Sequence, residues 1–334
     1  MLKKLKMTAV QVHVCAAILL MFAATASANE SFYTQVQSYA GASAHVEIVV
    51  SESFTLDGLV NVPAPASGSG ATLTIRSENP VAPVTLTRGI AGNLFTLASG
   101  RALVLRDIII DGGGNGEFAE GNAGTLVRVN SGGTLTVNDG AVLRNNVNSG
   151  DGGGVHVANG GNLTINGGEI IGNTASRGGG AYATGANGRI DMHGGKISGN
   201  TSSDLDGGGV DLRGGGVFTM SNGEISGNTG RDGGAVNVTG ANSRFTMAGG
   251  KINDNVATRE GGGVAVYATQ QGGFTMTGGE ITGNTATTNG GGVLVSGADR
   301  RFTMTGGKIS GNTSSTDGGG VDVRNGGIFT MSNG

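Results

Sequence analysis

The chain has 334 residues, of which 68 are glycine, while aromatic residues make up 4% and tryptophan is absent. So few large apolar side chains exclude a thick globular core, and glycine far above its usual ~7% share indicates either disorder or repeated tight turns. The formal net charge is −3, and it becomes −6 without the three N-terminal lysines, which argues against nucleic acid as a partner.

Residues 1–28 have the three parts of a secretory signal peptide. A lysine-rich start precedes an apolar run over residues 14–24, and small residues occupy positions 26–28. The apolar run is well short of the ~20 residues of a membrane span. We therefore predict cleavage before Asn29 and export to the cell surface, the outer membrane or the medium. No transmembrane segment is expected in the exported chain. Cys15 is the only cysteine, so the exported chain is also expected to lack disulfides.

Residues 29–92 are the least regular part and are expected to contain an N-terminal cap and the first coils of a repeat array. Residues 31–40 fit a short helix, and its apolar side would carry Phe32, Val36 and Tyr39. Alternating apolar residues then predict strands at 46–50, 54–56 and 71–75. An end unit of a repeat array needs an atypical cap to shield it, and this segment is placed to be one.

A repeat of about 28 residues fills residues 93–334. Its leading apolar residue is followed after seven positions by isoleucine and after ten by asparagine, and a glycine cluster with a Val-x-Val alternation comes next. The leading residues are Leu135, Leu163, Ile190, Phe218, Phe245, Phe274, Phe302 and Phe329. All variation in length falls between the asparagine and the glycines, or between the last valine and the next leading residue. Fixed strand–turn–strand offsets with elastic loops are what stacked coils require.

The pattern predicts an all-β fold, a right-handed single-stranded parallel β-helix with about 28 residues per three-strand coil. Glycine clusters and period-2 alternation exclude helical repeats, and a propeller blade needs ~40–50 residues. Like residues should stack between coils ~4.8 Å apart. We expect inward columns of Phe and Met, of Ile and of Val, and a column of asparagine amides that bond from coil to coil. The sequence stops at Gly334 in mid-coil, so we expect it to be a fragment of a longer protein.

Two charged columns are predicted on the outside of the coils. The residues before each isoleucine alternate in charge and should form a register-fixing ladder: Glu169, Lys196, Glu224, Lys251, Glu280 and Lys308. The residues before each glycine cluster include Asp206, Asp232 and Glu260 in three consecutive coils. Three carboxylates ~5 Å apart could bind Ca²⁺. Apart from this possibility, no cofactor is expected. The alternative is that these acids are solvated loop residues.

The middle residue of each Val-x-Val strand is predicted to face outward. These residues are His156, Tyr182, Asp211, Asn237, Ala265, Leu294 and Asp322. An enzyme on this scaffold would need clustered carboxylates on this face, as in glycosidic cleavage. Asp211 and Asp322 are four coils apart, roughly 19 Å, which is too far for joint action. His156 and His193 are expected to be surface residues, and no catalytic residue is predicted.

The repeat motifs Gly-Gly-Gly-Val-x-Val, Phe-Thr-Met-x-Gly-Gly-x-Ile and Gly-Asn-Thr resemble those of exported, pectin-lyase-like right-handed parallel β-helix proteins. Within that class, Gly179-Gly-Ala-Tyr182 and Gly233-Gly-Ala-Val236 resemble the repeats of polymorphic outer-membrane proteins and autotransporter adhesins. The resemblance implies a non-catalytic, monomeric surface rod that displays loops to a host protein, a matrix protein or a surface glycan. The alternative is a polysaccharide lyase or glycoside hydrolase on the same scaffold.

Overall fold

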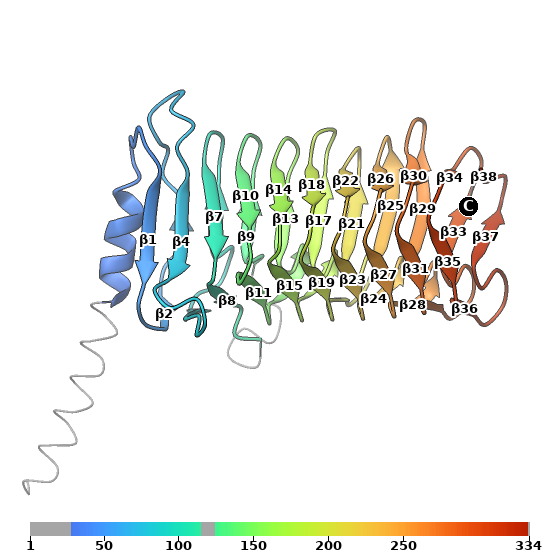
Figure 1. Ribbon diagram of the computed structural model, residues 1–334, viewed down its shortest axis with the longest axis horizontal. Helices are drawn as coiled ribbons and strands as arrows, with labels where there is room; N and C mark the ends of the chain where they lie inside the picture. The colour runs from blue at the N-terminus through green and yellow to red at the C-terminus, as the bar shows by residue number, and fades with distance from the viewer. Residues whose placement is uncertain (1–27, 115–123, 333–334) are drawn as a thin grey trace, which may run out of the picture.

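The computed structural model describes residues 28–114 and 124–332, and the predicted signal peptide lies outside these ranges apart from its last residue. The described chain winds into a parallel β-solenoid of about ten turns with about 28 residues per turn. Strands stack along one long axis from the N-terminal to the C-terminal end (Figure 1). The predicted all-β parallel β-helix is confirmed.

Sheets A and B form the first two sides of each coil and contain 11 and 10 strands. Sheet A consists of β1 (Val46–Val50), β4 (Leu73–Ser77), β7 (Ala102–Arg106), β10 (Thr134–Val137), β14 (Asn162–Ile165), β18 (Arg189–Met192), β22 (Val217–Met220), β26 (Arg244–Met247), β30 (Gly273–Met276), β34 (Arg301–Met304) and β38 (Ile328–Met331). Sheet B consists of β2 (Phe54–Leu56), β5 (Thr85–Arg88), β8 (Ile109–Asp111), β11 (Val142–Arg144), β15 (Glu169–Ile171), β19 (Lys196–Ser198), β23 (Glu224–Ser226), β27 (Lys251–Asn253), β31 (Glu280–Thr282) and β35 (Lys308–Ser310).

From sheet B the chain enters a short sheet D and then sheet C, before it returns to sheet A. Sheet D consists of β12 (Val147–Asp151), β16 (Thr174–Arg177), β20 (Thr201–Ser202), β24 (Thr229–Asp232), β28 (Val256–Glu260), β32 (Thr285–Ala286) and β36 (Thr313–Ser314). Sheet C consists of β3 (Val60–Asn61), β6 (Phe95–Leu97), β9 (Val127–Val129), β13 (Val155–Val157), β17 (Ala181–Thr184), β21 (Val210–Arg213), β25 (Val236–Ala241), β29 (Val264–Thr269), β33 (Val293–Ser296) and β37 (Val321–Arg324).

Sheet D is a fourth strand layer that the sequence did not predict. It occupies the variable segment between the asparagine and the glycine cluster, where the sequence analysis placed a loop. Its strands are as short as two residues, and its register shifts after Asn148 and again after Gly230. Strands this short and irregular leave no period-2 pattern, because the alternation needs several residues to appear.

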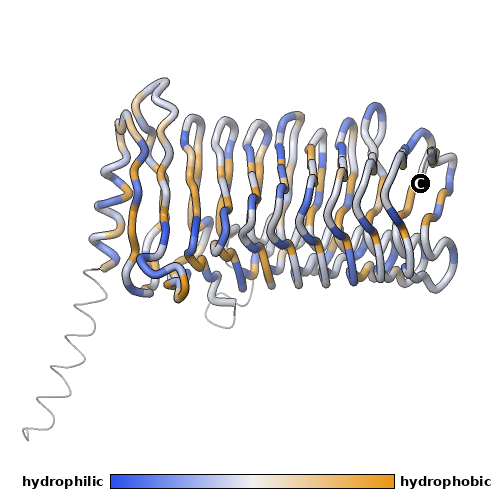
Figure 2. The backbone as a smooth tube through the Cα atoms, in the orientation of Figure 1, coloured by the Kyte–Doolittle hydropathy of each residue, from blue (hydrophilic) through white to orange (hydrophobic). Residues whose placement is uncertain are grey.

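The predicted interior columns are confirmed. Stacked rings run from Phe218 to Phe329, with neighbouring centroids 4.6–4.8 Å apart. Ile252 pairs with Ile225 on one side and Ile281 on the other. Figure 2 shows that hydrophobic residues recur in the strands of successive coils. The interior is therefore a set of repeated columns in register along the axis.

The buried asparagine column is also confirmed, and it joins every coil from Asn173 to Asn312. In each step the Oδ1 of one asparagine accepts hydrogen bonds from the backbone N–H and the Nδ2 of the asparagine one coil earlier. Asn255 illustrates the pattern: its Oδ1 lies 3.0 Å from the backbone nitrogen of Asn228 and 2.9 Å from that residue's Nδ2. The column thus satisfies backbone donors that the turn leaves unpaired.

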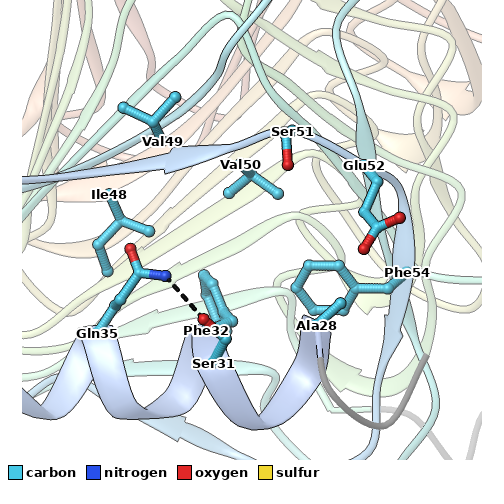
Figure 3. A pocket seen from close by; sticks show the side chains of 10 residues that line it. All are labelled: Ala28, Ser31, Phe32, Gln35, Ile48, Val49, Val50, Ser51, Glu52 and Phe54. Carbon is cyan, nitrogen blue, oxygen red and sulfur yellow. Dashed lines mark hydrogen bonds between the residues drawn. The ribbon is translucent and has the colours of Figure 1, made fainter. Parts of the chain in front are cut away.

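A helix at residues 28–37 covers the N-terminal end of the solenoid beside β1 (Figure 1). The predicted apolar side is confirmed, since Phe32, Val36 and Tyr39 are buried. The ring of Phe32 lies 5.6 Å from that of Phe54, and Figure 3 shows both beside the pocket between the helix and the first coil. Strands β1 to β5 already belong to the main sheets, so residues 29–92 contain coils as well as the helix.

The glycine clusters are needed where backbone segments of neighbouring coils touch. A Cβ at Gly262 would lie 2.4 Å from the carbonyl oxygen of Gly291 and 2.6 Å from the carbonyl carbon of Thr285.

We expect Gly262→Ala to lower the free energy of unfolding by about 3 kcal/mol or more. Gly227→Ala is the matched control, because that glycine has a positive φ but no atom nearer than 3.9 Å. It should cost only about 1 kcal/mol. If urea titrations show that both variants lose the same free energy of unfolding, close backbone contact is not what requires glycine at position 262.

Candidate functional site

The acidic column predicted as a calcium site lies where sheet D turns into sheet C. The backbone N–H after each column residue donates to the carbonyl of the next column residue, as from Gly207 to Asp232 and from Gly233 to Glu260. Asp232 and Glu260 are paired directly in the sheet. The predicted stacking of Asp206, Asp232 and Glu260 in consecutive coils is therefore confirmed.

Each of these three carboxylates contacts an arginine. Asp206 accepts from Arg213 at 2.8 Å and lies 3.1 Å from Arg231. Asp232 forms a two-fold pair with Arg259. Paired Arg–carboxylate forks are among the stronger hydrogen bonds in proteins. All three candidate calcium ligands therefore have a guanidinium group within 4 Å, and the contacts of Asp206 and Asp232 are the shorter ones.

Glu260 lies in a mixed polar cluster. The hydroxyl of Tyr267 donates to its Oε2 at 2.8 Å, the Nδ2 of Asn289 donates to its Oε1 at 3.0 Å, and Arg324 lies 3.5 Å away. Among the described residues, no three His, Cys, Asp or Glu side chains are placed to share a metal ion. Calcium would have to displace these partners, and the calcium site stays a prediction.

The middle residues of the Val-x-Val strands point away from the apolar core, as predicted, but this outward side is not open to solvent. Asp211, Asn237, Ala265 and Leu294 are all 0% exposed. The reason is the turn that leads out of sheet D. A Cβ added at Gly207 would lie 2.6 Å from the Cβ of Asp211, so the chain itself covers this strand.

Asp211 is a buried ion-pair residue. Its Oδ2 lies 2.7 Å from the Nε of Arg213, and its Oδ1 accepts a hydrogen bond from Asn237 at 2.7 Å. Arg213 also binds Asp206, so one guanidinium contacts a carboxylate of sheet C and a carboxylate of the turn between sheets D and C. The Asp-x-Arg spacing is a sequence signal for this contact, because residues two apart in a strand share a face, and Asp322 is paired with Arg324 in the same way.

Burial raises the pKa of Asp211 to about 6 from its ordinary 3.8, although Arg213 acts in the opposite direction. The folded chain therefore holds this proton at pH values where the unfolded chain has released it. This contribution to stability is fully present below pH ~4 and is lost as the pH rises through about 6.

We expect the free energy of unfolding to fall by about 3 kcal/mol as the pH rises through this range. Asp211→Asn should remove this part of the pH dependence of urea unfolding. An unchanged slope in the variant would contradict the assignment.

The two histidines differ in exposure. His193 is exposed, as predicted, and its Nδ1 lies 3.0 Å from the hydroxyl of Ser221. His156 is partly buried against the ring of Tyr182, with centroids 5.0 Å apart, and its Nδ1 lies 3.2 Å from a guanidinium nitrogen of Arg128. Burial, and then Arg128, lower the pKa of His156 to about 4. The imidazole is therefore neutral at pH 7, with a cation as its neighbour.

The alternating Glu/Lys column has the predicted register from Glu169 to Lys308. Lys196 and Glu224 lie 3.6 Å apart. Among the described residues, no other pair of this column has its charged atoms within 4 Å. The column lines an open groove of about 610 Å³ beside the turn from sheet A to sheet B. Because these side chains are substantially exposed, each pair contributes only ~0–1 kcal/mol. The column therefore acts mainly to keep neighbouring coils in register, rather than as a binding site.

Comparisons of the chain with protein-family models, with curated proteins and with solved structures find no significant match. Over residues 28–114 and 124–332, the structure has no helix that is long and apolar enough to cross a membrane. In the polar cluster between sheets D and C, arginines pair with carboxylates that the chain largely covers, whereas the arginine side chains are 28–49% exposed.

Proposed function

We propose that this chain is an exported, non-catalytic β-solenoid that serves as a stiff scaffold for binding at the cell surface. The observation that carries the proposal is the state of the best acid–base candidate: Asp211 is fully buried and bound to Arg213 and Asn237. A general acid or base must reach the proton that it transfers. A substrate cannot reach this carboxyl without opening the coil.

Export rests on the signal-peptide pattern of residues 1–28. The surface location and the adhesin-like role rest on the resemblance of the repeats to polymorphic outer-membrane proteins and autotransporter adhesins. A solenoid of stacked coils gives long faces on which side chains repeat at a fixed spacing, and such faces suit extended partners. The partners in this proposal are a host protein, a matrix protein or a surface glycan, and the rod acts as a monomer.

Two measurements test this proposal. N-terminal sequencing of the chain recovered outside the cytoplasm should give a protein that begins at Asn29. Incubation of that protein with polyuronic acids and other polysaccharides, with and without Ca²⁺, should release neither unsaturated sugars nor new reducing ends. Release of either product would favour the polysaccharide lyase or hydrolase alternative. Loss of that release in Asp211→Asn would identify the carboxyl responsible. A chain retained in the cytoplasm would contradict the export proposal.

A further inference from the structure

The outer face of sheet A carries a row of residues that precede the leading apolar residue of each coil. Strand pairing aligns Arg189 with Val217, Val217 with Arg244, and Arg244 with Gly273, and the next coil adds Arg301. A parallel column of threonines runs beside this row and consists of Thr219, Thr246, Thr275, Thr303 and Thr330. From β22 to β38 the strands of sheet A contain no aspartate or glutamate.

Arg244 and Arg301 differ from the other arginines of the described chain. Each of the others has a hydrogen bond or an ion pair with a carboxylate, a backbone carbonyl or a polar side chain, as Arg189 has with Asp191 in the same row. Within residues 28–114 and 124–332, the side chains of Arg244 and Arg301 have neither, and both residues are exposed. Two unpaired guanidinium groups therefore lie on a part of sheet A, from β22 to β38, whose strands carry no carboxylate.

Gly273 leaves a gap in the row between these two arginines. The gap is a pocket of about 160 Å³, lined by both guanidinium side chains, by Gln271 and by Thr246, Thr275 and Thr303. A side chain at position 273 would not fit, because its Cβ would lie 2.5 Å from the carbonyl oxygen of Arg301, and the φ of 145° is rare outside glycine. The three threonine hydroxyls make no hydrogen bond with any other described residue. The pocket thus combines free donors with a local positive charge.

We infer that this pocket binds a tetrahedral oxyanion, and specifically a sulfate group of a sulfated polysaccharide that lies along sheet A. Arg244 and Arg301 are two coils apart, about 10 Å, so their guanidinium groups approach one anion from opposite sides. A tetrahedral group presents oxygens in both directions, whereas a planar carboxylate presents its two oxygens to one side. This inference rests on the proposed binding function and names its ligand and its site.

The surroundings of the pocket favour a polysaccharide as the carrier. The exposed lining is polar, because Phe245 and Phe274 are each only 1% exposed. It therefore offers no apolar contact for a lipid chain or for the side chains of a peptide. The threonine column continues the face in both directions with a hydroxyl every ~4.8 Å. Such a track can hydrogen-bond the hydroxyls of an extended sugar chain on either side of the sulfate.

The test measures binding of dextran sulfate to the immobilised exported chain, with uncharged dextran and polygalacturonate as comparison polymers. The double variant Arg244→Gln/Arg301→Gln should weaken binding of dextran sulfate by about tenfold or more, since two charge-assisted contacts are lost. Arg189→Gln is the matched control: it removes the same charge from the same row, but from an arginine already paired with Asp191. It should change binding by less than about twofold. Arg244→Lys/Arg301→Lys should stay weak, because lysine lacks the planar fork.

Three results would overturn the inference. The first is an equal loss in Arg189→Gln, which would mean that binding follows total charge rather than this pocket. The second is equally tight binding of polygalacturonate, which would mean that the pocket does not select a tetrahedral anion. The third is equally tight binding of inorganic sulfate or phosphate, which would indicate a free-ion site. None of these results bears on export or on the absence of product, so the proposed function is judged separately. Matching circular-dichroism spectra would confirm that each variant is folded.

Discussion

Replacing Asn255 with alanine is expected to lower the free energy of unfolding by about 3–6 kcal/mol. The side chain is fully buried and bonds in two directions: its Oδ1 accepts from the backbone N–H and the Nδ2 of Asn228, and its Nδ2 donates to Ile225 and to the Oδ1 of Asn284. Alanine would leave the N–H of Asn228 buried without an acceptor. The carbonyl of Ile225 would lose this donor. Buried unpaired groups of this kind cost ~1–3 kcal/mol each.

Urea unfolding followed by far-ultraviolet circular dichroism measures this loss, and Asn253→Ala provides the matched control. Asn253 lies two residues away, at the end of β27, and its Nδ2 donates to the exposed Asp254. Its neighbours in the sheet are Ser226 and Thr282, so this column tolerates other polar residues. The control should cost less than about 1 kcal/mol. If the two variants lose the same stability, the asparagine column does not hold the coils together.

Phe245→Ala is expected to cost about 3–5 kcal/mol, because it opens a cavity inside the stacked rings. The ring is 1% exposed and lies 4.8 Å from those of Phe218 and Phe274, with interplanar angles of 10° and 6°. Neighbouring coils constrain the backbone on both sides, so the cavity cannot collapse easily. The loss should appear as a lower urea midpoint for the coils around β26.

Phe245→Leu tests whether a smaller apolar side chain is tolerated at this position. Leucine holds the same place in earlier coils, at Leu135 and Leu163, and both are fully buried there. This variant should therefore lose less than half as much stability as Phe245→Ala. A loss below about 1 kcal/mol in the alanine variant would contradict a close-packed column at this position.

The sequence predicted the features that depend on fixed spacing. The Phe, Ile and Asn columns and the Glu/Lys register follow from constant offsets between the leading residue, the isoleucine and the asparagine. Side chains at equal offsets must stack when strands pair in register. These features involve only the parts of the repeat whose length never changes.

The features that the sequence did not predict come from the segment of variable length. Sheet D forms there, and its exit turn covers Asp211, which was predicted only to face outward. The arginine partners of Asp206 and Asp232 come partly from neighbouring coils, so they become visible only when the loops are placed in space. The pocket at Gly273 likewise appears only when Arg244 and Arg301 are aligned along the axis.

The most direct test of the stacked-coil account is a set of distances between spin labels on the threonine column of sheet A. Cysteines replace Thr136 together with Thr219, Thr275 or Thr330 in the exported chain, which is expected to contain no other cysteine. These pairs are three, five and seven coils apart. The account predicts distances near 14, 24 and 34 Å, a rise of about 4.8 Å per coil. Distances that fail to rise in these equal steps would show that like residues do not stack along one axis, and would contradict the account.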